Sequence, residues 1–280
     1  MDPPGRTGCA VVTHTRLRIG LCQVVSTADP AENLALMRQW VRRAADAGAR
    51  VVVFPEATMA HFGAPLAELA QPLDGPWPTA VADLADAHDV LIVAGMFTPA
   101  GDRIHNTVLL TGLGKHLGYN KIHLYDAFGY RESDTVAAGT DCVTVTVDGF
   151  GLGIATCYDV RFPTLFQRLA EQGASAVLLP TSWGAGDGKA EQWDILVSAR
   201  ALDTGCWVLG CDQADPGTTG TQVDPNAPTG IGRSVVIDPL GRIEGRLGAA
   251  PGLLIVDIDD TVVSDARAAT GVLANRATIL

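Results

Sequence analysis

Residues 151–163 read Gly-Leu-Gly-Ile-Ala-Thr-Cys-Tyr-Asp-Val-Arg-Phe-Pro. The apolar run up to Ala155 predicts a buried strand, and Pro163 begins an amphipathic helix that ends at Gly173. Cys157 is therefore expected at the turn between a strand and a helix, where helix amides can stabilise a thiolate. A free cysteine is more often a small buried hydrophobe, so this stretch alone does not establish a nucleophile.

The composition is that of a globular protein with an acidic surface. The 280 residues are 47% hydrophobic and 18% charged, with a formal net charge of −11 and no cluster of Lys and Arg. This balance argues against a nucleic-acid partner and against an anionic membrane surface. The longest apolar runs, such as 51–54 and 176–179, are strand-sized and far below the roughly 20 residues of a membrane span.

The cysteines and histidines suggest neither a disulfide framework nor a metal centre. Six cysteines are scattered without a CxxC pair, which favours reduced thiols and a cytoplasmic protein. The N-terminus also lacks the continuous apolar stretch of a signal peptide. The six histidines show no HxxxH or HExxH spacing, so no metal ligands are predicted, and no cofactor is called for.

The periodicity predicts one domain over 16–280, preceded by a flexible N-terminal tail at 1–15. Helices are expected from Pro30 to Gly48, at about 77–88, from Pro163 to Gly173 and at 189–204. Strands are expected at about 17–25, 51–56, 90–97, 105–111, 116–122, 142–148, 150–156, 176–182, 206–211 and 232–237. Residues 123–140 and 215–230 are expected to be loops.

The second half of the chain repeats the order of the first. The strand at 176–182 resembles the one at 51–58, since each is an apolar run that ends in Pro and polar residues. The strand at 206–211 then matches 90–95, and 232–237 matches 106–110. Two similar α-β-β halves facing each other predict an α/β fold, a four-layer α-β-β-α sandwich with the helices outside.

Three chemically useful side chains each end an apolar strand: Glu56, Lys121 and Cys157. Residues at equivalent strand ends converge on one rim of a sheet-based fold, which is where sites form. A thiol, a base and an ammonium there suit acyl transfer, because the thiol attacks a carbonyl and the ammonium stabilises the oxyanion. Taken singly, each residue is more often structural or solvated, and spacing alone leaves both interpretations open.

The motifs around these residues carry a resemblance. Phe-Pro-Glu56-Ala, Asn120-Lys121-Ile-His-Leu and Cys157-Tyr-Asp-Val-Arg-Phe-Pro resemble the three signature motifs of the nitrilase superfamily of carbon–nitrogen hydrolases. The match covers roughly 16–265, with the motifs in the family's order. It is most similar to the branch that contains omega-amidase and deaminated glutathione amidase.

The resemblance implies a Glu–Lys–Cys triad. Glu56 would be general base and acid, Lys121 would stabilise the oxyanion, and Cys157 would be the nucleophile that forms a thioester. Because Glu56 must exchange a proton, its pKa should be raised by burial. A second family glutamate corresponds to Glu132, which would hold Lys121 and orient the substrate amide; the competing interpretation of Glu132 is a surface loop charge.

Arg161 lies where related carbamoylases place an arginine that binds a substrate carboxylate. Those enzymes have a second arginine immediately before it, and here that position is Val160. The alternative is a structural Arg161 that pairs with Asp159 or with a helix end. Asp159 itself is expected to be structural.

Further residues are expected around the substrate. The backbone N–H of Tyr158 is expected to help stabilise the oxyanion, and Thr181, Ser182 and Trp183 are expected to line the opposite wall of the pocket. The loops 59–76, 123–140 and 213–230 are expected to shape it.

The leading hypothesis is an amidase that converts a small carboxamide to a carboxylic acid and ammonia. A substrate with a carboxylate, such as a 2-oxo acid omega-amide, suits Arg161 and the resemblance. Alternatives are a specialised C–N hydrolase or acyl transferase on another amide or an N-carbamoyl compound, a nitrilase, or a non-catalytic binding protein. Family members usually dimerise, so a homodimer through the helices at 162–173 and 189–204 is predicted.

Overall fold

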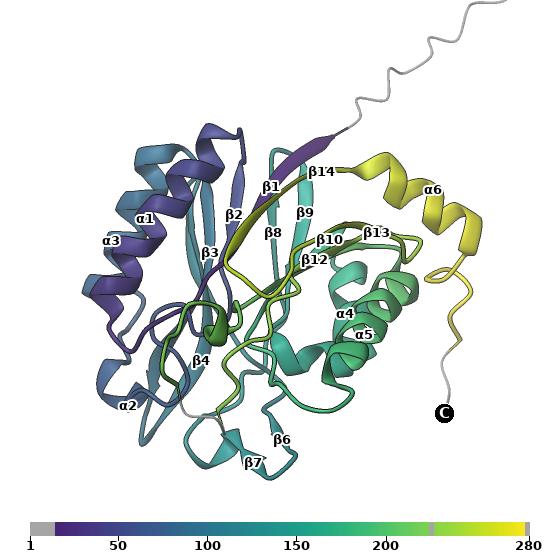
Figure 1. The fold of residues 1–280 in the computed structure, drawn as a ribbon. Coiled ribbons are helices and arrows are strands. Elements are labelled where there is room, and N and C mark those ends of the chain that lie inside the picture. The colour runs from purple at the N-terminus through teal and green to yellow at the C-terminus, as the bar shows by residue number, and fades with distance from the viewer. Residues whose placement is uncertain (1–14, 224–226, 278–280) are drawn as a thin grey trace, which may run out of the picture.

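The computed structural model describes residues 15–223 and 227–277, so all of the predicted tail except Thr15 lies outside the described residues. Two six-stranded sheets face each other, and helices cover their outer faces (Figure 1). This arrangement is the four-layer α-β-β-α sandwich that the repeated order of elements predicts, and the fold prediction is confirmed.

The first sheet has the strand order β14-β1-β2-β3-β4-β5. Its strands are β14 (Gly252–Asp259), β1 (Arg16–Gln23), β2 (Val51–Val53), β3 (Leu91–Ala100), β4 (Arg103–Gly112) and β5 (Lys115–Asn120). Its outer face is covered by α1 (Pro30–Asp46) and α3 (Pro76–His88), and the short α2 (Leu66–Leu69) lies below them in Figure 1. The Asp29 carboxylate accepts the Ala31 N–H and caps α1, as its Asp-Pro start predicts.

The second sheet has the order β13-β12-β11-β10-β9-β8. Its strands are β13 (Ile243–Arg246), β12 (Val235–Ile237), β11 (Trp207–Asp212), β10 (Ala176–Thr181), β9 (Phe150–Ile154) and β8 (Val143–Val147). Helices α4 (Pro163–Glu171) and α5 (Lys189–Thr204) cover its outer face. The last helix of the described residues is α6 (Asp260–Thr270), which follows β14.

The two halves correspond element by element. The succession β2-α3-β3-β4 in one sheet matches β10-α5-β11-β12 in the other, with β1 and β9 in equivalent places. Parallel pairing joins β1, β2 and β3, and it likewise joins β9, β10 and β11. The carboxyl ends of these central strands therefore lie at one edge of each sheet.

The inner faces of both sheets form one continuous apolar core. It includes Val53, Val93 and Leu110 from the first sheet and Leu152 and Leu178 from the second, all of them fully buried. Because β2, β9 and β10 are buried on both faces, they read as nearly unbroken apolar runs rather than as alternating ones. This packing fixes the distance between the sheets, and with it the distance between residues at their edges.

Several features were not predicted from the sequence. The carboxyl-terminal strand β14 pairs antiparallel with β1 and completes the first sheet. The predicted loop at 123–140 contains a small hairpin, β6 (Asp126–Ala127) and β7 (Tyr130–Arg131), followed by a 3₁₀ turn over Glu132–Asp134. Three more differences involve only a few residues. The predicted strand at 232–237 begins at Val235, and two short segments, Cys157–Arg161 and Pro216–Thr218, form 3₁₀ turns.

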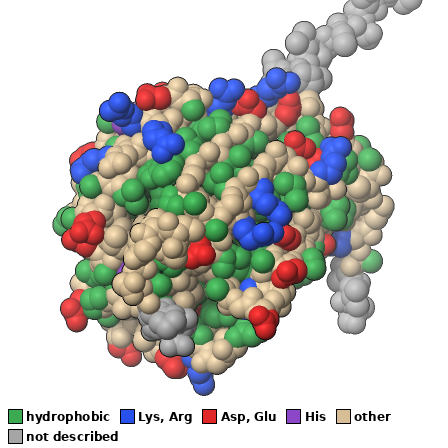
Figure 2. Space-filling model, in the orientation of Figure 1, with side chains coloured by type: hydrophobic (Ala, Val, Ile, Leu, Met, Phe, Trp, Pro, Cys, Tyr) green, Lys and Arg blue, Asp and Glu red, His purple; other side chains and the backbone are tan. Residues whose placement is uncertain are grey.

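The surface mixes both signs of charge. On the face drawn in Figure 2, acidic and basic side chains are interspersed among apolar and uncharged ones. None of the helices in the described part of the chain has both the length and the apolar character to cross a membrane.

The close approach of β3 to the turn after β2 requires glycine. A Cβ on Gly95 would lie 2.7 Å from the carbonyl carbon of Glu56 and would also collide with the amide of Ala57. We expect Gly95→Ala to reduce the free energy of unfolding by about 1–3 kcal/mol, since overpacking forces the backbone apart, and to displace Glu56. Chemical denaturation measures the first effect; equal stability of variant and parent would contradict it. Gly248→Ala is the control, because a Cβ there meets nothing within 4 Å.

Candidate active site

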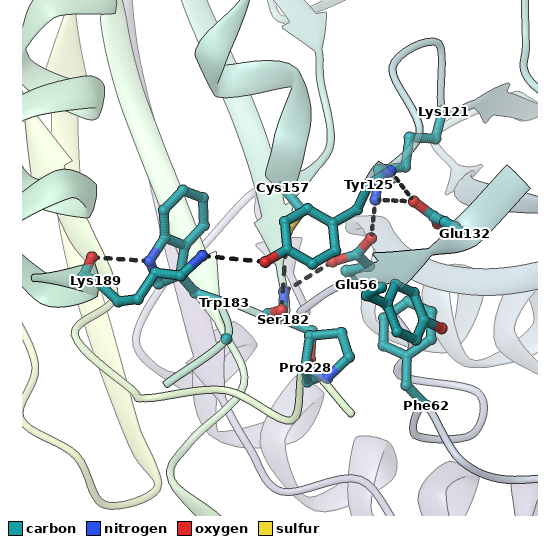
Figure 3. Close-up of a pocket in the computed structure, with 12 residues that line it drawn as sticks. Glu56, Phe62, Lys121, Tyr125, Glu132, Cys157, Ser182, Trp183, Lys189 and Pro228 are labelled. Carbon is teal, nitrogen blue, oxygen red and sulfur yellow. Dashed lines mark hydrogen bonds and ion pairs between the residues drawn. The ribbon is translucent and has the colours of Figure 1, made fainter. Parts of the chain in front are cut away.

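The strand ends bring four residues from both sheets together at one edge of the sandwich (Figure 3). Glu56 follows β2 and Lys121 follows β5 in the first sheet, while Cys157 follows β9 and Ser182 follows β10 in the second. All four are buried.

Lys121 is held between two carboxylates. Its Nζ lies 2.9 Å from Glu56 Oε1 and 2.9 Å from Glu132 Oε2, and all three side chains are at most 2% exposed. Asn106, from β4, donates from Nδ2 to Glu56 Oε1 at 2.8 Å and to Glu132 Oε1 at 2.9 Å. The interpretation of Glu132 as a surface loop charge is therefore wrong: its side chain is buried and holds Lys121.

The charges of this cluster shift its proton equilibria. Burial by itself lowers the pKa of Lys121, but attraction to Glu132 and Glu56 outweighs burial, and the net pKa lies well above its ordinary value. Lys121 is thus a permanent cation. Burial raises the pKa of Glu56 against the opposing pull of Lys121, and the negative charge of Glu132 raises it further. Glu56 can therefore exchange a proton more readily than an exposed carboxylate can.

Cys157 adopts a backbone conformation that is uncommon for a residue with a side chain. Its φ is +46°, in the left-handed region, and its Sγ lies 3.8 Å from the carbonyl oxygen of Ser182. Burial, and then the negative charge of Glu56, raise the pKa of the thiol well above its ordinary value. The resting group is a thiol, and its proton must pass to a base as it attacks. Strained backbone of this kind is concentrated at functional sites.

Asp159 holds the Cys157 turn in place. Its carboxylate accepts the Thr156 N–H at 2.9 Å, the Tyr119 hydroxyl at 2.6 Å and the His123 N–H at 3.0 Å, and it contacts His123 Nδ1 at 2.7 Å. With Thr156 as its partner it forms a reciprocal capping box. The geometry fits the expected structural role of Asp159 and leaves His123 in a supporting role.

The second sheet supplies the opposite wall through its backbone. The N–H of Ser182 donates to Glu56 Oε2 at 2.9 Å, so it orients the carboxylate that faces the thiol. The next N–H, of Trp183, donates to Asp212 Oδ1 at 2.7 Å. Asp212 is fully buried at the end of β11, and burial raises its pKa well above the ordinary value. Gln213 binds the carbonyl of Glu56 at 3.0 Å and ties the two strand ends together.

These residues enclose a pocket with an empty volume of about 360 Å³. All three predicted loops contribute, with Phe62 from the first, Tyr125 and Tyr130 from the second and Pro228 from the third. The full lining is Glu56, Phe62, Lys121, Tyr125, Tyr130, Glu132, Cys157, Ser182, Trp183, Gly184, Lys189 and Pro228.

The remaining predicted residues lie around this pocket. Thr181 is buried in β10, where its hydroxyl donates to the carbonyl of Leu179, and it is not part of the lining. Tyr158 packs its ring against Tyr125. Arg161 does not line the pocket either; its guanidinium donates to Gln192 Oε1 at 2.6 Å rather than pairing with Asp159.

Sequence reasoning missed three groups of this site. Asn106 could have been found as the one amide inside an apolar strand, and Lys189 as a cation in the first turn of a helix, where acidic residues are favoured. The contact of the Ser182 N–H with Glu56 could not be predicted, because every residue except proline has a backbone N–H. Within the described residues, no group of three or more His, Cys, Asp or Glu side chains is arranged to hold a metal ion.

The cluster as a whole suits attack on an amide carbonyl. It contains a thiol, a carboxylate with a raised pKa beside it, and a fixed cation, enclosed in a pocket of apolar and aromatic walls. A model of the family described as carbon-nitrogen hydrolase matches residues 18–268 of this chain. The chain belongs to the carbon–nitrogen hydrolase family.

The names of individual relatives agree with membership of this family. It is 48% identical to hydrolase Rv0480c of Mycobacterium tuberculosis, over 93% of this chain and 95% of the relative. It is 31% identical to a deaminated glutathione amidase of Escherichia coli O157:H7, over 88% and 91% of the two chains. The nitrilase superfamily resemblance, and with it the prediction of an enzyme that acts on C–N bonds, is confirmed.

A solved structure adds a chemical observation on a similar protein. An amidase from Nesterenkonia sp. AN1 shares 26% identity with this hydrolase, with a TM-score of 0.75 and 93% of each chain covered. Its glutamate-to-glutamine mutant carries the acetamide moiety of fluoroacetamide covalently on the active-site cysteine.

We expect alkylation of Cys157 by iodoacetamide to depend on ionised Glu56. Glu56 accepts the thiol proton only when it is deprotonated, and its pKa is raised. The rate should therefore fall with decreasing pH at a midpoint above 4.5, the ordinary value of a glutamate. Glu56→Gln should slow alkylation by about 100-fold, a typical contribution of a general base.

Peptide mass spectrometry reads the Cys157 adduct separately from that of Cys142, which is half-buried. Glu68→Gln, on the exposed side of α2, is the matched control. Unchanged alkylation in Glu56→Gln would contradict the role of Glu56 as proton acceptor.

Proposed function

We propose that this hydrolase converts a small carboxamide to a carboxylic acid and ammonia through a thioester on Cys157. The observation that carries the proposal is the buried contact of Lys121 with Glu56 beside the strained Cys157, inside one pocket. A binding protein gains nothing from a buried thiol, amine and carboxylate that each cost desolvation energy.

In the first half-reaction the thiol proton passes to Glu56 as sulfur attacks the amide carbon. The oxygen becomes an anion, which Lys121 and the N–H of Tyr158 stabilise. The C–N bond then breaks, and the proton returns from Glu56 to the departing nitrogen, which leaves as ammonia. The acyl group remains on sulfur as a thioester.

In the second half-reaction Glu56 takes a proton from water, and the resulting hydroxide attacks the thioester. The same cation stabilises the second oxyanion. The C–S bond breaks, the thiolate regains the proton from Glu56, and the carboxylic acid departs. Glu132 and Asn106 hold Lys121 and Glu56 in place, because Glu132 pairs with Lys121 and Asn106 donates to both glutamates.

For the substrate we propose an amide that also bears a carboxylate, such as a 2-oxo acid omega-amide. Relatives named deaminated glutathione amidase at about 31% identity support this class. The positive charge of Lys189 in the pocket lining, with Arg161 nearby against the Trp183 ring, also supports it. An amine in place of water in the second half-reaction would make the protein an acyl transferase, and the assay below distinguishes the two.

The direct test is ammonia release from a panel of primary amides. We expect release from 2-oxoglutaramate that Cys157→Ala abolishes, with a decrease of at least 10⁴-fold because the nucleophile is lost. In Glu56→Gln, ammonia release should also fall, since Glu56 accepts a proton in both half-reactions. Ammonia release without free acid would indicate transfer to an amine, and release by Cys157→Ala would contradict the mechanism.

We further propose that this hydrolase is a homodimer that uses α5. Ile195 is 68% exposed and Leu202 is 49% exposed, and their spacing of two helical turns places both on one face. We expect sedimentation velocity to give a dimer, and Ile195→Glu with Leu202→Glu to shift it to monomer. A monomeric parent protein would contradict this proposal.

We also propose a reducing, cytoplasmic location. The five cysteines that the structure describes are free thiols, and one of them is Cys157, whose proposed chemistry requires the reduced form.

A further inference from the structure

Lys189 is a buried cation in the pocket, and the mechanism above does not use it. It is only 8% exposed and lines the same pocket as Cys157. Trp183 fixes its backbone, since the indole N–H donates to the carbonyl of Lys189 at 2.9 Å. In Figure 3, the Lys189 ammonium reaches the Tyr125 hydroxyl, whereas that of Lys121 points to Glu56 and Glu132.

The ammonium of Lys189 has fewer partners than it can use. Its Nζ lies 3.1 Å from the hydroxyl of Tyr125 and 3.7 Å from the ring centre of Phe128, and it forms no ion pair with any residue that the structure describes. An ammonium has three donors, so its hydrogen-bonding capacity exceeds what these contacts use. A buried charge without a counter-ion is costly unless a ligand supplies one.

A second cation, Arg161, lies near Lys189. Its guanidinium is 5.4 Å from the ring centre of Trp183, its Nε is buried without a hydrogen-bond partner, and no carboxylate of the described chain pairs with it. Burial and the charge of Arg161 both lower the pKa of Lys189. In a chain with a net charge of −11 and only three lysines, two neighbouring cations without a carboxylate are unusual.

The position of Lys189 in α5 also works against stability. It is the first residue of a 16-residue helix, where the helix dipole disfavours a cation and favours an anion. No side chain caps this end, because the preceding residue is Gly188. Violations of local preference of this kind are expected where function requires the residue.

We propose that Lys189, supported by Arg161, binds a carboxylate at the end of the substrate remote from the scissile amide. This inference rests on the proposed amidase function and names the residue that recognises the carboxylate of the proposed substrate. Since Lys189 and not Arg161 lines the pocket, Lys189 is the group that contacts the carboxylate, and Arg161 adds positive potential. The ring centres of Tyr125, Phe128 and Trp183 lie 5.3, 3.7 and 5.7 Å from the Lys189 ammonium and surround the proposed contact.

The test compares two amides of similar length and size. Glutaramate has a carboxylate where 5-methylhexanamide has an isopropyl group of similar size, so the pair differs in charge and polarity at that end. We expect the hydrolase to prefer glutaramate in kcat/KM, and Lys189→Met to reduce the ratio of the two kcat/KM values by roughly 30-fold, typical for loss of a charge-assisted hydrogen bond. Lys189→Arg should restore part of the preference, and Lys115→Met, which removes a lysine outside the pocket, should leave the ratio unchanged.

A binding measurement separates this inference from the proposed chemistry. Glutarate cannot lose ammonia, and calorimetry should detect its binding to the parent protein and a loss of binding in Lys189→Met. If no amide is hydrolysed but glutarate binds through Lys189, the amidase proposal fails and the anion site stands. The inference is overturned if Lys189→Met leaves the ratio and glutarate binding unchanged. It is also overturned if both kcat/KM values fall equally, or if the parent protein prefers the uncharged amide.

Discussion

The ion cluster of Lys121 with Glu56 and Glu132 is the interaction on which the site depends. Three ionisable groups that are at most 2% exposed are stable only because each satisfies the others, and removal of one would leave a buried charge unpaired. With two carboxylates for one ammonium, the cluster carries an excess of negative charge. Burial raises the pKa of Glu56 and of the neighbouring thiol, and this negative charge raises both further.

The duplicated architecture explains how such a cluster is assembled. Each half contributes its central strands in parallel, and their carboxyl ends meet where the two sheets face each other. The first sheet supplies Glu56 and Lys121, the proposed base and cation, and the second supplies Cys157, the proposed nucleophile, and the backbone around Ser182. Neither half contains a complete site, so catalysis requires the apolar core between the sheets to hold them at a fixed separation.

The sequence predicted those parts of the molecule that leave a periodic or motif signal. Buried strands and the repeated order of elements gave the four layers, and strand ends placed Glu56, Lys121 and Cys157 at one rim. The edge strand β14 was not predicted, and the hairpin around Phe128 is too short to show a period. Thr181 was expected in the pocket wall. Successive side chains of a strand point to opposite faces, and the Thr181 hydroxyl binds the carbonyl of Leu179 in its own strand. Arg161 stands at a motif position that predicted a contact with the substrate. In the structure its guanidinium donates to Gln192, and Lys189 lines the pocket instead.

Ser182 gives this arrangement a mechanical consequence. One residue of the second sheet contacts both reacting groups: its N–H binds the Glu56 carboxylate across the interface, and its carbonyl lies 3.8 Å from the sulfur within its own sheet. A slide of one sheet over the other by an ångström would separate base from nucleophile while leaving every strand and helix intact. Mild heat or denaturant would thus abolish enzymatic activity before the secondary structure is lost. The loss of activity would then report a change in the alignment of the two sheets.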